Sequence, residues 1–178
     1  MIPKLFEMTK GVGGREQNLS LIQGLITWSW IISSSLGSDP EALSWPETGD
    51  TQKNLVHDGD RETSGFLGVS IGSTSGYFDG TLRATFASPR NITRIYVKGN
   101  AAREEGNASG SRILSFNVDG NQIDAVATAQ GSPSILDNST GWNNVTTVDM
   151  RLYANYSRPS GGGFAYGVYY EFEIYGFA

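Results

Sequence analysis

The feature that most constrains the fold is a succession of short runs of Val, Ile, Thr, Phe, Tyr and Trp, separated by turns rich in Gly, Ser and Asn. These residue types favour strands, and no segment shows a convincing helical period. Strands at such regular spacing predict an all-β chain that forms a sandwich of about eight antiparallel strands. We expect strands at residues 66–71, 81–86, 92–98, 111–118, 122–128, 145–153 and 167–175.

Alternation within these runs indicates which faces are buried. Leu82, Ala84 and Phe86 alternate with polar neighbours, so one face of that strand should meet a core. Residues 25–30 alternate in the same way and predict a buried strand. The run Val118-Asp-Gly-Asn121 is a strong signal for a two-residue hairpin turn.

The chain divides into an arm and one domain. Residues 1–18 carry Gly11-Val-Gly-Gly14 beside charged residues, which predicts an extended N-terminal arm that is disordered or docks on another subunit. Residues 19–178 have the length of a single β-sandwich domain. Within it, residues 33–54 are rich in Ser, Gly and Pro and predict a long loop, and loops of that length are usually functional.

Charge and composition exclude several partners. The net charge of −5 argues against nucleic acid, because phosphate binding needs a basic face. The chain has no cysteine, which rules out disulfides and thiolate chemistry. Residues 19–32 are apolar but too short and too interrupted for a spanning helix, and they start too late for a signal peptide. We therefore expect no membrane insertion and recognise no signal peptide.

Two segments predict a calcium site. Asp58, Asp60 and Thr63 surround Gly59, and a short loop of oxygen-bearing side chains can fold round a hard cation such as Ca²⁺. The last strand carries Glu171 and Glu173; if it alternates, one of those carboxylates has to face inward and needs a partner. A calcium ion between loop and strand would satisfy both. The alternative is that Asp58-Gly-Asp60 is only a turn.

Catalytic groups are few. The only histidine, His57, adjoins the Asp-Gly-Asp turn, and no Gly-x-Ser-x-Gly motif occurs. The candidate acid pairs for glycoside hydrolysis are Glu104-Glu105, in an expected flexible loop, and Glu171 with Glu173, in a strand. We expect the protein not to be an enzyme.

Groups suited to binding sugars are more abundant. Aromatic faces stack on the C–H surfaces of sugars, and planar polar side chains bond their hydroxyls. The alternative is that the aromatic residues pack loops onto the core or contact a neighbouring subunit. The candidate ligand-binding residues are Trp45, Tyr77, Arg103, Asn155, Tyr156, Arg158, Phe164 and Tyr166.

Four motifs in order resemble a known family. They are Leu55-Val-x-Asp-Gly-Asp-x-x-Thr63, Ile92-Thr-Arg-Ile-Tyr-Val97, Phe116-Asn-Val-Asp-Gly-Asn121 and Glu171-Phe-Glu-Ile-Tyr-Gly176. Over about residues 30–178 the chain resembles the galactose-binding-domain-like jelly rolls, which include discoidin and coagulation-factor C-type domains and many bacterial carbohydrate-binding modules. One departure is Gly65-Phe66, where members usually have a tryptophan.

The resemblance implies a jelly-roll sandwich with a ligand site on the loops at one end. It also implies a structural calcium held by the side chains of Asp58, Asp60, Thr63 and Glu171, with backbone carbonyls near Leu55 and Thr63 completing the shell. The implied partner is a glycan or a cell-surface polysaccharide.

We therefore expect a non-catalytic, calcium-stabilised carbohydrate-binding or adhesion module displayed on a virion or cell exterior. We expect it to be an oligomer or part of an assembly that contacts neighbouring subunits through its arm. The alternative is a structural subunit of a larger assembly, such as a phage tail, fibre or capsid-decoration protein. A small hydrolase is the third hypothesis.

Overall fold

Antiparallel strands make up most of the residues that the computed structural model describes, which are 14–34, 56–70, 75–103, 111–129, 132–157 and 164–177. The strands are β1 (Gln17–Asn18), β2 (Ile26–Ser34), β3 (Gly65–Ser70), β4 (Ser75–Arg103), β5 (Arg112–Val118), β6 (Asn121–Ala127), β7 (Ser134–Asn138), β8 (Trp142–Ser157) and β9 (Phe164–Gly176). A 3-10 turn, η1 (Leu19–Leu21), follows β1. No helix among the described residues is long and apolar enough to cross a lipid bilayer.

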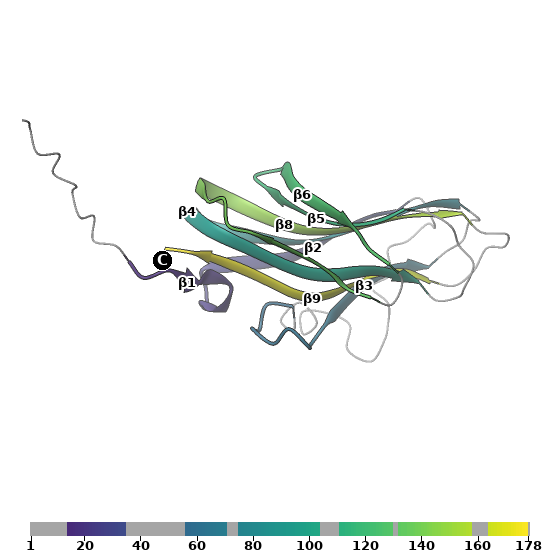
Figure 1. Ribbon diagram of the computed structural model, residues 1–178, viewed down its shortest axis with the longest axis horizontal. Helices are drawn as coiled ribbons and strands as arrows, with labels where there is room; N and C mark the ends of the chain where they lie inside the picture. Colours follow the sequence, from purple (N-terminus) through teal and green to yellow (C-terminus); the bar gives the residue numbers. More distant parts are fainter. Residues whose placement is uncertain are drawn as a thin grey trace, which may run out of the picture.

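The long strand β4 belongs to two sheets. Its residues 75–86 pair with β2 on one side and β8 on the other, and β5 and β6 extend this five-stranded sheet. Its residues 92–103 pair with β7 and β9 in the second sheet. The register shifts between Thr85 and Ile92, around Pro89, a residue that cannot donate to a ladder. In Figure 1, β8, β5 and β6 lie on one side of the molecule and β9 and β3 on the other.

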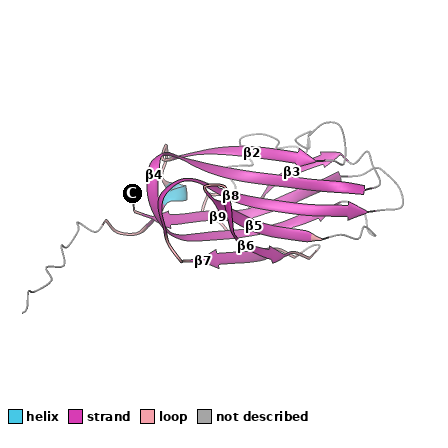
Figure 2. Cartoon of the chain, turned by 90° about the horizontal axis from the view of Figure 1, so that it is seen from above, coloured by secondary structure: helices cyan, strands magenta, loops and turns pink. Residues whose placement is uncertain are grey.

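The core lies between the two sheets, whose strands overlap when the molecule is seen from above (Figure 2). Alternate residues of the five-stranded sheet point inward, so that Leu82 pairs with Met150, which pairs with Phe116. From the second sheet, Tyr169 packs edge-on against the ring of Trp30, with 4.8 Å between ring centroids. All of these side chains except the half-buried Trp30 are fully buried.

The edge of β9 that does not pair with β4 is covered by several segments rather than by one strand. β3 pairs with its first half, and β1 pairs with its last two residues. Between them, the Phe172 amide donates to the carbonyl of Val56 (2.6 Å), and the Ser20 hydroxyl bonds the Phe172 carbonyl and the Ile174 amide. Gln17 and Asn18, the end of the expected N-terminal arm, are thus part of the sheet, while residues 1–13 lie outside the described residues.

These observations confirm the predicted antiparallel all-β jelly-roll sandwich. The expected strands at 81–86 and 92–98 are two halves of β4, and β7 was not expected from the sequence. The predicted hairpin is confirmed, because Asp119 and Gly120 both have positive φ (47° and 82°) between β5 and β6, as a type I′ turn requires.

Candidate functional site

The loop from Asp58 to Thr63 gathers oxygen atoms as the sequence predicts. The Thr63 hydroxyl donates to the Asp58 carboxylate (3.1 Å) and to the Asp60 carbonyl (2.8 Å). The Asp60 amide donates to Asp58 Oδ1 (2.8 Å), and Gly59 between them has a φ of 84°. The side chain of Asp60 accepts the Glu62 amide instead (3.0 Å). Asp58, Thr63 and the Asp60 backbone therefore converge, while one oxygen of the Asp60 carboxylate is bonded to the Glu62 amide.

This loop is fixed to the outer side of the second sheet. Arg61 forms an ion pair with Glu173, and its guanidinium lies 4.0 Å from the centroid of the Tyr96 ring. Lys98 Nζ donates to the Arg61 carbonyl (2.7 Å) and lies 3.3 Å from a carboxylate oxygen of Glu62. Lys98 and Tyr96 belong to β4, and Glu173 belongs to β9. Contacts to two strands therefore hold the loop in place.

Glu171 lies beside the same loop and is fully buried. The expectation that one of Glu171 and Glu173 faces inward was wrong, because residues two apart on a strand share a face. Phe172 and Ile174 occupy the core face, so both glutamates lie on the opposite face. Glu173 has Arg61 as its partner, but within the described part of the chain neither carboxylate oxygen of Glu171 has a hydrogen-bond partner.

The electrostatics of Glu171 follow from this burial. Loss of solvent, together with the nearby carboxylates of Glu173 and Asp58, raises the pKa of Glu171 to about 8. The backbone N–H groups of Phe172 and Gly59 partly offset the rise, although neither forms a hydrogen bond of normal geometry with the carboxylate. A cation at this position would oppose the shift, because a nearby positive charge favours the ionised carboxylate.

The residues fit a calcium ion better than they fit a transition metal. Among the described residues, no three His, Asp or Glu side chains converge as a metal-binding group. The oxygens available are the carboxylates of Asp58 and Glu171, the Thr63 hydroxyl and the Asp60 carbonyl, and hydroxyl and carbonyl ligands suit Ca²⁺. The predicted contribution from near Leu55 lies outside the described residues.

His57 is placed for packing. Its ring stacks on Trp28 with 4.1 Å between centroids and an angle of 5°, and Trp28 in turn meets Phe172 edge-on. This arrangement ties the loop to β2 and β9.

The structure brings together only part of the predicted ligand-binding set. Tyr77 and Asn155 are cross-strand partners on β4 and β8, Tyr77 half-buried and Asn155 exposed. Tyr166 lies on the second sheet, where its ring is 6.3 Å from that of Phe66. Trp45 and Arg158 lie outside the described residues, as do the side chains of Arg103, Tyr156 and Phe164, whose backbones lie in strands.

Beside Tyr77 lie residues that the sequence analysis did not single out. The rings of Tyr77 and Tyr153 are nearly parallel, with an angle of 19° and 6.1 Å between centroids. The guanidinium of Arg151 is 5.5 Å from the Tyr153 centroid and forms two hydrogen bonds with Asp79 (2.7 and 2.6 Å). Alternation would have placed Tyr77 and Asp79 on one face of their strand and Arg151 and Tyr153 on one face of theirs.

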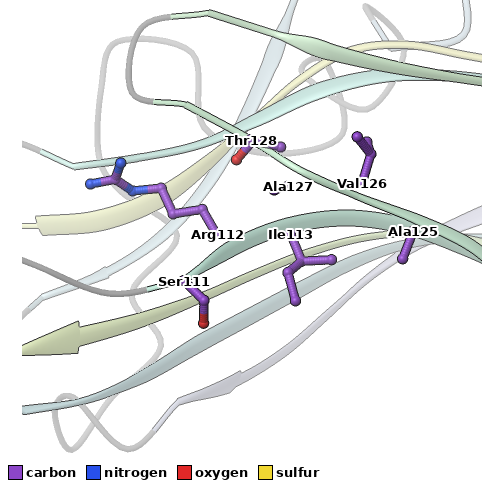
Figure 3. A pocket seen from close by; sticks show the side chains of 7 residues that line it. All are labelled: Ser111, Arg112, Ile113, Ala125, Val126, Ala127 and Thr128. Atoms are coloured by element: carbon purple, nitrogen blue, oxygen red, sulfur yellow. The ribbon is translucent and has the colours of Figure 1, made fainter.

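A shallow depression of about 460 Å³ follows the β5–β6 ribbon next to this face. Figure 3 shows that Ser111 and Ile113 point to one side of the ribbon and Arg112, Val126 and Thr128 to the other. The small side chains of Ala125 and Ala127 also line the depression, and Ala127 is the cross-strand partner of Ile113. Ile113 is the cross-strand partner of Tyr153, so the depression begins one strand away from the tyrosine pair.

Comparisons with known proteins find likeness in solved structures alone. No protein-family model matches the chain, and no curated protein matches it. A chitosan-binding module 1 derived from the chitosanase/glucanase of Paenibacillus sp. IK-5 is 20% identical, with 91% of this chain and 100% of that one covered and a TM-score of 0.39. The family 32 carbohydrate-binding module of C. perfringens NanJ, in complex with galactose, is 14% identical, with 90% and 99% covered and a TM-score of 0.36.

A third solved structure, TmCBM61 in complex with β-1,4-galactotriose, is 10% identical, with 83% and 88% covered and a TM-score of 0.38. These structures are carbohydrate-binding modules, the class that the sequence motifs resemble. Every TM-score among the three is below 0.5, so the ligands of these modules do not indicate the ligand of this chain.

Proposed function

We propose that this protein is a non-catalytic carbohydrate-binding or adhesion module stabilised by calcium. The observation that supports the binding role is the arrangement of Tyr77, Tyr153 and Asn155 at one end of the five-stranded sheet. Two parallel aromatic rings beside an exposed amide offer a sugar both a stacking surface and hydrogen bonds. Tyr77 and Asn155 are also two of the residues that the sequence predicts for this role.

The proposed calcium has a structural role, because the ion would join the loop before β3 to the last strand. The observation that supports it is the buried, unpartnered carboxylate of Glu171 next to Asp58. When bound, the ion supplies positive charge between two carboxylates. Asp58 and Glu171 would hold it, with the Thr63 hydroxyl and the Asp60 carbonyl.

Display on a virion or cell exterior stays a prediction from the sequence, and so does contact with neighbouring subunits through the arm. The alternative, a structural subunit of a larger assembly, predicts stable oligomers without any affinity for glycans. Measuring the oligomeric state by mass photometry alongside glycan binding separates the two functions.

The test of the proposed function is a glycan array probed with a multimerised form of the protein in calcium. A single site should bind with a dissociation constant of about 0.1–1 mM, so several linked copies are needed for detection. Tyr77→Ala should remove the signal, since it deletes half of the aromatic pair. Tyr175→Ala is the matched control, because Tyr175 lies on the second sheet with Arg94 beside its ring. A blank array for the wild type would contradict the proposal.

A further inference from the structure

We propose that the outer face of the five-stranded sheet binds an extended, uncharged polysaccharide chain. This face is formed by the outward side chains of β4 from Tyr77 to Thr85 and of β8 from Thr147 to Asn155, with their neighbours on β2 and β5. The inference rests on the proposed carbohydrate-binding function, but it places the ligand along the sheet instead of on the loops at its end.

The centre of the outer face consists of two paired charges held in fixed orientations. Arg83 forms two hydrogen bonds with Asp149 (2.7 and 2.8 Å), and Arg151 forms two with Asp79 (2.7 and 2.6 Å). The side chains of Arg83 and Arg151 are 37% and 32% exposed. Each guanidinium has five N–H donors and uses two in its pair, so donors remain for sugar hydroxyls.

The pairing also indicates the charge of the ligand. Each arginine of the two pairs has an aspartate as its partner, and no lysine lies on the described strands of this face. The chain as a whole has a net charge of −5. At Arg83 and Arg151 an acidic polysaccharide would meet cations that are already paired, and the net negative charge of the chain would repel it. An uncharged polysaccharide would not be repelled.

The remaining side chains favour a hydroxylated ligand over a protein. Thr81, Thr85 and Thr147 are half-buried residues of the face, and each has a hydroxyl that can bond a sugar. The only large aliphatic side chain strongly exposed there, among the described residues, is Ile31, at 41%. Protein interfaces have an apolar centre, and this face has a polar one with its aromatic pair at one end.

The shape of the face suits a chain rather than a single sugar. Tyr77 and Thr85 are eight residues apart on one strand, which corresponds to about 26 Å at about 3.3 Å per residue. The tyrosine pair, the Asp79–Arg151 pair and the Arg83–Asp149 pair follow one another along that length. Several consecutive sugar units can therefore contact the face at once.

The test is a measurement of affinity for neutral polysaccharides, namely a galactan and a β-glucan, with an acidic alginate beside them. Arg83→Gln combined with Asp149→Asn removes the charges but keeps two amides that can bond each other. This double variant should bind the neutral chain about tenfold more weakly or worse. The matched control is Arg94→Gln combined with Asp137→Asn, since Arg94 and Asp137 form the same kind of pair on the second sheet (2.7 and 2.6 Å). The control should bind as the wild type does.

A second measurement on the wild type alone keeps the test decisive if the double variant fails to fold. Affinity should rise from a disaccharide to a hexasaccharide and should be insensitive to salt between about 0.05 and about 0.5 M. Three results would overturn binding along the sheet while leaving carbohydrate binding intact. They are equal affinity for both lengths, a preference for alginate, and unchanged binding by a folded Arg83/Asp149 variant. Dimers that this variant abolishes would show a subunit interface instead. Failure of the wild type to bind any glycan would overturn the proposed function as well.

Discussion

At the scale of residues, Glu171 and Glu173 have similar positions and different partners. Both lie on the outward face of β9 beneath the Asp58 loop, and both are buried. Arg61 neutralises Glu173, while Glu171 has the carboxylates of Glu173 and Asp58 as neighbours. Burying a charge without a partner lowers the stability of the folded protein, unless a ligand pairs with that charge. This contrast supports the proposal that a cation binds at Glu171.

The raised pKa of Glu171 predicts how the free energy of unfolding changes with pH and on replacement of the carboxylate. The raised pKa means that, between about pH 4.5 and about 8, folded calcium-free protein holds a proton that the unfolded chain has lost. Its free energy of unfolding should therefore fall as pH rises through that window. At pH 8 in chelator, Glu171→Gln should raise the free energy of unfolding by about 1–3 kcal/mol.

Urea unfolding of wild type and variant at pH 5 and pH 8 measures this difference. The variant should also lose its response to calcium. A Glu171→Gln protein that is less stable than the wild type at pH 8 in chelator would show that the carboxylate has a partner other than a cation.

At the scale of elements, the two sheets pack closely enough that single glycines matter. Gly167 on β9 is buried in the core, and an alanine Cβ there would lie 2.7 Å from Cε2 of Tyr169 and 2.8 Å from Cδ1 of Leu152. Overpacking of this kind costs about 1–3 kcal/mol. We expect Gly167→Ala to lower the melting temperature by about 2–12 °C.

Differential scanning calorimetry measures this change, and Gly14→Ala is its control, because nothing lies within 4 Å of the Cβ added there. Equal melting temperatures for the two variants would mean that the sheets can separate to accept a methyl group at no cost.

Some of these elements could be predicted from the sequence, and others could not. Alternation and turn residues predicted the sandwich and the Asp119-Gly120 hairpin, because both signals are local. They did not predict that β4 continues past Pro89 or that Ser134–Asn138 forms β7, since both depend on pairing with strands distant in sequence.

The same limit explains which residues of the candidate sites could be predicted from the sequence. Asp58, Thr63 and Glu171 were predicted from a motif and a resemblance, whereas the pairs Asp79–Arg151 and Arg83–Asp149 become visible only once β4 lies beside β8.

At the scale of the whole molecule, the edge of β9 is where separate parts of the chain meet. Ser20, Val56, β1 and β3 all bond this strand, and His57 reaches across to Trp28 of β2. A cation beside Glu171 would act at this junction and so stabilise the fold as a unit. With a dissociation constant of about 10 µM and about 2 mM free calcium, the gain is about 3 kcal/mol.

The most direct test is thermal unfolding of the wild-type protein in about 2 mM calcium and again in excess chelator. We expect the melting temperature to be about 6–12 °C higher in calcium, which is about 3 kcal/mol for a domain of this size. Asp58→Ala should melt at one temperature in both buffers. If the wild-type curve is the same with calcium and with chelator, no cation joins the loop to β9, and the Asp58-Gly-Asp60 segment is only a turn.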